Sequence, residues 1–140
     1  MKTDPKVLSS FLAAAVWADG EYDEFEKEFV QELGEELEIA TLSDTLENEI
    51  VSTEKMDEAA LADYLEAAAK KVAKDEAEGI LTLCLQLMCV DAYLAQDEVD
   101  NFISFAEILG VDEERANIIL DEFVNEEEDL IVESENVSAE

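Results

Sequence analysis

The longest apolar stretch of the chain runs from residue 80 to residue 95 and reads ILTLCLQLMCVDAYLA. It contains only two strongly polar side chains, Gln86 and Asp91. The stretch is shorter than the roughly 20 apolar residues that a membrane-spanning helix needs. We therefore predict that it forms the buried central helix of a soluble helical bundle.

Amphipathic patterns on both sides of this stretch predict an all-α fold. Apolar residues recur at helical spacing in six further segments, and no segment alternates apolar and polar residues between turns as a strand would. Capping residues and helix-ending glycines give the boundaries. The first three predicted helices run from a cap at Asp4 to a stop at Gly20, from Phe25 to Leu37, and from a cap at Ser43 to Val51. The fourth and fifth run from a cap at Asp57 to Lys74 and from a cap at Asp75 to about Tyr93. The last two run from Val99 to Leu109, before Gly110, and from a cap at Asp112 to Phe123.

The length of 140 residues predicts one domain that can bury a core without disulfides or metals. We assign residues 1–125 to this helical domain. From residue 126 the chain becomes polar and acidic, so we expect residues 126–140 to form a mobile acidic tail. The first residues, from Met1 to Pro5, carry an acid and a proline too early for a signal peptide, and we expect a cytoplasmic protein.

The charge of the chain is strongly unbalanced, with 39 acidic residues against 8 basic ones and a net charge of −31. Such a surface repels the phosphates of nucleic acids and the head groups of anionic lipids. We therefore predict neither nucleic-acid binding nor direct membrane insertion. The same surface attracts cations and basic proteins, so we expect a protein partner. The sequence does not indicate an oligomeric state.

The sequence lacks the residues on which most enzymes depend. It has no histidine, no glycine-rich phosphate loop and no nucleophile with a base nearby. A hydrolase that uses paired carboxylates is the alternative, but short helical hairpins offer no large substrate cleft, and we predict no enzyme. The C-x4-C spacing of Cys84 and Cys89 fits neither a disulfide framework nor a zinc motif, so we predict buried, reduced thiols.

Two parts of the chain align without gaps at an offset of 72 residues, the difference between positions 19 and 91. Apolar residues match along this alignment, as Leu8 with Ile80, Leu12 with Cys84, Leu33 with Phe105, and Leu37 with Leu109. Two positions clearly differ, since Phe25 aligns with Asp97 and Phe29 aligns with Asn101. The alignment predicts a seven-helix bundle of two pseudo-symmetric helical-hairpin halves that share one core.

Acidic residues fall at matching positions of the two predicted bends. The first bend reads ADGEYDEFE from residue 18 to residue 26, and the second reads VDAYLAQDE from residue 90 to residue 98. The Ala-Asp-Gly-Glu-x-x-x-x-Glu pattern after an apolar helix resembles the TerB family of tellurite-resistance proteins, over roughly Leu8 to Phe123. The second copy departs from that pattern at Ala92, where the glycine is missing.

The resemblance implies an all-helical bundle with a role in bacterial resistance to tellurite and chemical stress. It also implies a divalent-cation site at the four matching acids, which are Asp19, Glu26, Asp91 and Glu98. Four carboxylates without an imidazole favour Ca²⁺, Mg²⁺ or Mn²⁺ over Zn²⁺.

Helix capping is the alternative role for these acids. Asp23 and Glu26 form a capping-box pattern. The counterpart of Asp23 is Ala95, which has no capping side chain, and this counts against a capping role in the second half. Asp91 interrupts an apolar stretch, so its carboxylate must be solvated, paired with a base such as Arg115, or bound to a metal.

We predict an acidic intracellular binding module of the stress-response type, with a divalent-cation site at the junction of its two halves. The alternative is a metal-free protein-interaction adaptor that recognises a basic or amphipathic partner. Binding that fails in the presence of a chelator would indicate the first of these functions.

Overall fold

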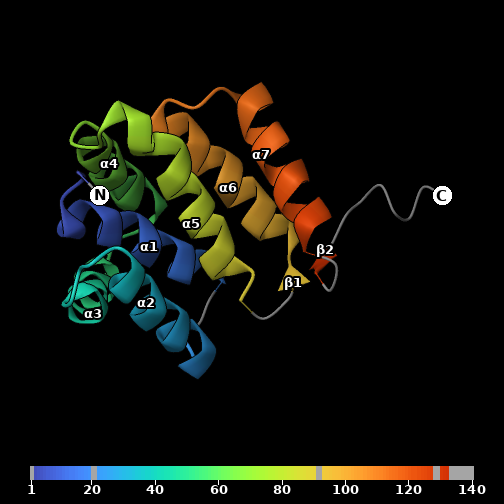
Figure 1. The fold of residues 1–140 in the computed structure, drawn as a ribbon. Helices are drawn as coiled ribbons and strands as arrows, with labels where there is room; N and C mark the ends of the chain where they lie inside the picture. The colour runs from blue at the N-terminus through green and yellow to red at the C-terminus, as the bar shows by residue number, and fades with distance from the viewer. Residues whose placement is uncertain (1, 20–21, 91–92, 128–129, 133–140) are drawn as a thin grey trace.

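The computed structural model describes residues 2–19, 22–90, 93–127 and 130–132 of the chain, and it shows an all-α fold (Figure 1). In chain order the elements are α1 (Pro5–Asp19), α2 (Glu24–Glu36), α3 (Leu42–Thr53), α4 (Glu58–Ala69), the short 3₁₀ turn η1 (Lys74–Glu76), α5 (Ala77–Met88), β1 (Tyr93–Leu94), α6 (Gln96–Leu109), α7 (Glu113–Glu126) and β2 (Ile131–Val132). The seven α-helices of the described chain confirm the predicted fold class. Within these residues, no helix has the length and apolar character needed to cross a membrane.

The core is built around α1, which is buried on all sides. Every residue from Val7 to Val16 is buried, and α1 packs against α3, α4, α5 and α6. Small residues such as Ser9 and Ala13 let these neighbours approach closely. The sequence had predicted an amphipathic α1 and a central α5. The structure instead places α1 at the centre, while α5 is buried on one side and open on the other.

The predicted repeat is present in the positions of the helices. α5 and α6 begin at Ala77 and Gln96, each 72 residues after the starts of α1 and α2 at Pro5 and Glu24. α7 also lies where this offset places α3, which the sequence alignment did not show. Each half therefore contains three helices. α4 connects the halves and has no counterpart among the helices described.

α2 and α6 end in the same hydrogen-bond pattern, a Schellman motif. In each motif a residue just past the helix has a positive φ, which is +80° at Gly110, the first residue after α6, and +59° at Glu38, the second residue after α2. At the end of α6, the N–H of Gly110 donates to Glu107 O at 3.1 Å, and the N–H of Val111 donates to Ala106 O at 2.8 Å. At the end of α2, the N–H of Glu38 donates to Glu35 O at 3.2 Å, and the N–H of Ile39 donates to Gly34 O at 2.8 Å. The predicted helix end at Gly110 is confirmed. A glutamate occupies the equivalent left-handed position of α2, where glycine is usual.

Two predicted caps are confirmed by hydrogen bonds. Asp4 Oδ1 accepts from Lys6 N–H at 2.8 Å, and Asp57 Oδ1 accepts from Ala60 N–H at 2.8 Å. Asp112 is the N-cap residue of α7, although its side chain makes no capping bond to a described group. The predicted stop at Gly20 lies outside the described residues.

Four predicted boundaries were wrong. α4 ends at Ala69, so Lys74 lies in η1 and not at the end of this helix. α3 begins at Leu42, so Ser43 lies inside the helix. Asp75 does not cap α5, because it lies in η1, where its carboxylate accepts from Lys2 Nζ at 3.0 Å. α5 ends at Met88, well before Tyr93. The apolar stretch continues past the helix because it also supplies the fully buried Leu94 of β1.

β1 and β2 form a two-stranded parallel pair that the sequence did not predict. Tyr93 pairs with Ile131, and Leu94 pairs with Val132. β2 and the last residue of α7 fall within the segment assigned to the acidic tail. The mobility of residues 126–140 stays a prediction.

Candidate functional site

Glu26 is a buried acid in the first turn of α2. Its Oε1 accepts the N–H of Asp23 at 3.3 Å, and Asp23 Oδ1 accepts the N–H of Glu26 at 3.0 Å. These two bonds are the predicted capping box, which satisfies N–H groups that the helix itself leaves without acceptors. The residue is only 3% exposed.

Glu98 has the same place and the same bond in α6. It is also 3% exposed, and its Oε1 accepts the N–H of Ala95 at 2.9 Å. This bond needs only the backbone N–H of Ala95. The lack of a polar side chain at Ala95 therefore does not prevent capping by Glu98. The inference that Ala95 counts against a capping role was therefore wrong, because it considered only one of the two bonds of a capping box.

The predicted cation site is described only in part. Figure 1 shows that α1 and α5 end on the side of the bundle where α2 and α6 begin. Asp19 is the last residue of α1, but its side chain and the whole of Asp91 lie outside the described residues. Among the residues that are described, no three acids or cysteines come close enough to hold a metal ion. A cation at Asp19, Glu26, Asp91 and Glu98 thus stays a prediction.

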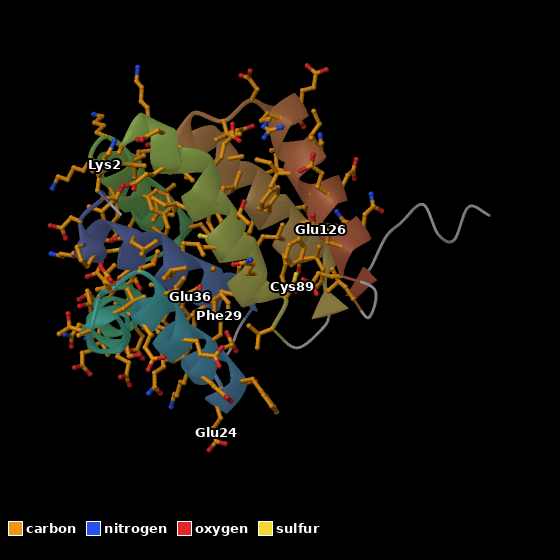
Figure 2. The ribbon with its side chains drawn as sticks, viewed as in Figure 1. Lys2, Glu24, Phe29, Glu36, Cys89 and Glu126 are labelled. Atoms are coloured by element: carbon orange, nitrogen blue, oxygen red, sulfur yellow. The ribbon has the colours of Figure 1, made fainter. Side chains whose placement is uncertain are left out.

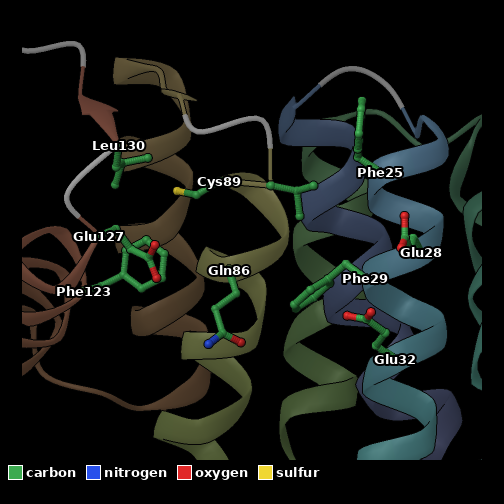
Figure 3. A pocket seen from close by; sticks show the side chains of 10 residues that line it. Phe25, Glu28, Phe29, Glu32, Gln86, Cys89, Phe123, Glu127 and Leu130 are labelled. Carbon is green, nitrogen blue, oxygen red and sulfur yellow. The ribbon is translucent and has the colours of Figure 1, made fainter.

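An open groove of about 500 Å³ lies on the side of the bundle where α5 ends, between α2, α5 and the end of α7 (Figure 3). Figure 3 shows Phe29 and Glu32 on the α2 side, Phe123 and Glu127 on the α7 side, and Gln86 between them on α5. The groove has apolar walls and acids at its edges. The residues that line it are Phe25, Glu28, Phe29, Glu32, Gln86, Cys89, Val90, Phe123, Glu127 and Leu130.

A second hollow of about 260 Å³ continues this groove along α5 and α7. The two hollows share Gln86, Phe123 and Glu127. The far end is closed by an ion pair in which Arg115 donates two N–H groups to Glu78 Oε1, at 2.9 and 3.1 Å. This carboxylate also raises the pKa of Arg115. We call the combined feature the α5 groove.

Negative charge surrounds the α5 groove. Glu28 and Glu32 are exposed one turn apart on α2, and Glu122, Glu126 and Glu127 line the α7 side. Figure 2 shows a further acid, Glu24 at the start of α2, pointing away from the bundle. A ligand in this groove would therefore meet an apolar interior and a carboxylate edge.

Phe25 and Phe29 are the site residues that the sequence analysis did not identify. Phe25 is 69% exposed, and it is one of the few large apolar residues exposed in the described chain. The signal was present, since both aromatic residues differ from their repeat counterparts, Asp97 and Asn101.

The two cysteines differ in their access to the groove. Both are buried thiols, as predicted, and no disulfide joins them. Burial raises the pKa of Cys84 to about 12, so this thiol is unreactive near neutral pH. Cys89 is 9% exposed and lines the groove. It can therefore report whether the groove is occupied.

Comparison of the chain with protein-family models, with curated proteins and with solved structures gives no match. A function must therefore be argued from the chemistry and geometry of the site.

Proposed function

We propose that this protein is a non-catalytic acidic binding module that takes a basic, partly apolar segment of a partner protein into the α5 groove. The observation that carries this proposal is the exposed Phe25 beside the half-buried Phe29 in the groove, at positions where the other half of the repeat has polar residues.

The repeat provides an internal control for these two aromatic side chains. α6 folds with Asp97 and Asn101 at the equivalent positions, where Asp97 is exposed and its backbone carbonyl accepts from Asn101 Nδ2 at 2.8 Å. A helix in this place therefore does not need aromatic residues to form. Exposed aromatic residues next to a groove are typical of protein-binding surfaces, where they supply large contact areas.

The charge of the groove indicates the chemistry of the partner. Carboxylates on both edges favour a ligand with lysine or arginine on its outer side, and the net charge of −31 accelerates the approach of such a ligand. The apolar interior requires leucine, isoleucine, valine or phenylalanine on the inner side of the ligand.

A TerB-like role with a bound divalent cation is the second candidate. It is favoured by the burial of Glu26 and Glu98 at equivalent places near the junction of the halves, because buried acids must be paired, hydrogen-bonded or metal-bound. Under this proposal the cation is Ca²⁺, Mg²⁺ or Mn²⁺, and it joins Asp19 and Asp91 to the two glutamates. The module then acts in bacterial stress resistance.

The groove proposal can be tested with the double variant Phe25→Asp/Phe29→Asn, which copies the residues of α6. The probe is a synthetic peptide of leucine and lysine, and binding is measured as protection of Cys89 from alkylation. Phe25→Asp adds a negative charge, so non-specific attraction of a cationic peptide should increase in the variant. Binding in the groove should decrease, because the aromatic contacts are lost. Equal or stronger protection in the variant would overturn the proposal.

A further inference from the structure

In the first half of the protein, two helices cover the face of α1 that carries Val7 and Ser10. Ser10 Oγ donates to Glu49 Oε1 of α3 at 2.8 Å and lies 3.4 Å from Tyr64 Oη of α4. Val7 and Ser10 also line a small cavity with Tyr64 and Ala68 of α4. Both residues are buried as a result.

In the second half, the equivalent face of α5 is open. The counterparts of Val7 and Ser10 are Gly79 and Thr82, which line the α5 groove. Gly79 is exposed, and a Cβ placed on it would have no described atom within 4 Å. α7 leaves this face open because it packs chiefly on α6, whereas its counterpart α3 packs closely on α1. The second half thus lacks the cover that α4 gives to the first.

We infer that the α5 groove binds a basic amphipathic α-helix of a partner protein, which lies on α5 as α4 lies on α1. This inference rests on the proposed function and specifies the conformation of the segment that is bound. The bound helix supplies the cover that is missing from the second half.

The dimensions of the groove fit a helix of about three turns. The residues of α5 that line it, Gly79, Thr82 and Gln86, follow the three- and four-residue spacing of one helix face, and Val90 lines the groove just past the end of α5. From Gly79 to its end at Met88, α5 rises over roughly 14 Å at 1.5 Å per residue. The sequence from Gly79 to Val90 contains no charged residue, so a partner helix can lay its apolar side along this floor.

The inner side of α4 indicates what such a helix presents. α4 turns Leu61, Leu65 and Ala68 towards the core, and these residues follow helical spacing. A partner helix with a similar apolar side would place its other side between the glutamates of α2 and α7. Lysine or arginine there would pair with these carboxylates, since the two rows of acids flank the groove.

The acidic tail of the chain is a poor occupant of this groove. An offset of 72 from α4 falls at residue 130 and beyond, where Leu130 lines the groove and Ile131–Val132 form β2. Residues 133–140 carry three glutamates and no lysine or arginine. Carboxylates on both edges of the groove would repel that segment. The charge therefore favours a separate, basic partner.

The test compares two synthetic peptides of about 14 residues, a length of roughly four helical turns. The first places leucines on one helix face and lysines elsewhere. The second has the same sequence with two central residues of D configuration, which disrupt the helix without changing charge or composition. Binding is measured in about 0.5 M salt, where non-specific electrostatic attraction is screened.

The readout is protection of two thiols from alkylation in the full-length protein. Cys89 reports one end of the groove, and the variant Gly79→Cys adds a reporter at the other end, where space is open. A helix lying along α5 should slow alkylation at both positions by about tenfold when the peptide is present at about ten times its Kd. The peptide should also gain helical circular dichroism on binding.

The outcomes separate the two proposals. Protection of both thiols by the first peptide alone supports a bound helix. If both peptides protect Cys89 equally, or if position 79 stays reactive, the helix inference is overturned. The proposed function survives that result, provided that Phe25→Asp/Phe29→Asn abolishes the protection of Cys89. If neither peptide protects either thiol, the proposed function fails and the inference fails with it.

Discussion

Glu26 and Glu98 make the same hydrogen bond at the starts of α2 and α6, since each carboxylate accepts the backbone N–H of the residue three positions before it. Both side chains are buried, and they stand one repeat apart in the sequence. Their shared role in capping is sufficient to explain why a glutamate recurs at this position. It also gives a way to distinguish a structural role from cation binding.

Replacement of Glu98 by alanine should lower the free energy of unfolding by about 1 kcal/mol, because the Ala95 N–H loses its acceptor. Glu98→Gln keeps an acceptor oxygen and should cost less. The measurement is urea denaturation in chelator, with Asp97→Ala as the control, since Asp97 is an exposed acid in the same turn. Equal losses in Glu98→Ala and Glu98→Gln would show that the carboxylate acts through its charge and not as a cap.

A specific cation site should raise the thermal midpoint of the wild type but not that of Asp91→Asn. At 100 times its Kd, a cation adds about 2.7 kcal/mol, which corresponds to roughly 5–10 °C in a domain of this size. Scans in chelator and in Ca²⁺, Mg²⁺ or Mn²⁺ must use matched ionic strength, because a charge of −31 is stabilised by general screening. Identical shifts in both proteins, or no shift in either, would eliminate the cation site.

The variant Glu38→Gly should stabilise the protein by about 0.5–1 kcal/mol, because glycine adopts a positive φ without steric strain. Gly110→Ala, at the equivalent place, should cost about 1 kcal/mol. A Cβ at Gly110 would meet no described atom within 4 Å, so this cost reflects backbone conformation and not a clash. The variant Glu38→Gln removes the charge and keeps the side chain, so it separates the effect of charge from that of backbone conformation. If Glu38→Gln stabilised the protein as much as Glu38→Gly, the gain would come from loss of the carboxylate charge.

Gly34→Ala should destabilise the protein, although alanine normally favours a helix. A Cβ on Gly34 would lie 2.9 Å from Ile39 O and 3.3 Å from Leu42 Cβ, where the end of α2 meets α3. We expect a cost of about 1–3 kcal/mol from this overpacking. Gly79→Ala, with open space around its Cβ, is the matched control and should gain about 0.5–1 kcal/mol. A gain at both positions would contradict the close contact.

Stability should fall between pH 10 and pH 12 in a way that depends on Tyr22. Burial, followed by the charges of Glu47 and Glu26, raises the pKa of Tyr22 from 10.0 to about 12. In this range the unfolded tyrosine has lost its proton while the folded one retains it, so a rise in pH favours the unfolded state. Urea midpoints of the wild type and Tyr22→Phe at pH 8 and pH 11 give the measurement. The wild type should lose more stability than the variant, and equal losses would refute the assignment to Tyr22.

Local signals in the sequence predicted most helix positions, because caps and helix ends depend on neighbouring residues. Asp57 and Asp23 cap the helices that follow them, and Gly110 ends α6 as expected. The errors arose where tertiary contacts override local preference. Asp75 has a capping side chain but pairs with Lys2 from the start of the chain, 73 residues away.

The candidate groove could be predicted only in part. The mismatch between Phe25 and Asp97 was visible in the alignment, and it marks one wall. Phe123 and Leu130, on the opposite wall, carry no sequence signal that connects them to α2. Their meeting depends on how α7 packs against α6, which a local pattern does not specify.

The sequence by itself determined the helical class, the 72-residue repeat, most helix boundaries and the acidic character of the surface. These features depend on periodicity, capping and composition, all of which act over a few residues or over the whole chain. The tertiary structure decided that α1 is buried on every side, that β2 pairs with β1, and that α5 keeps an open face. The physical reason is that an apolar stripe shows which side of a helix avoids water, while the partner that covers it depends on the packing of distant segments.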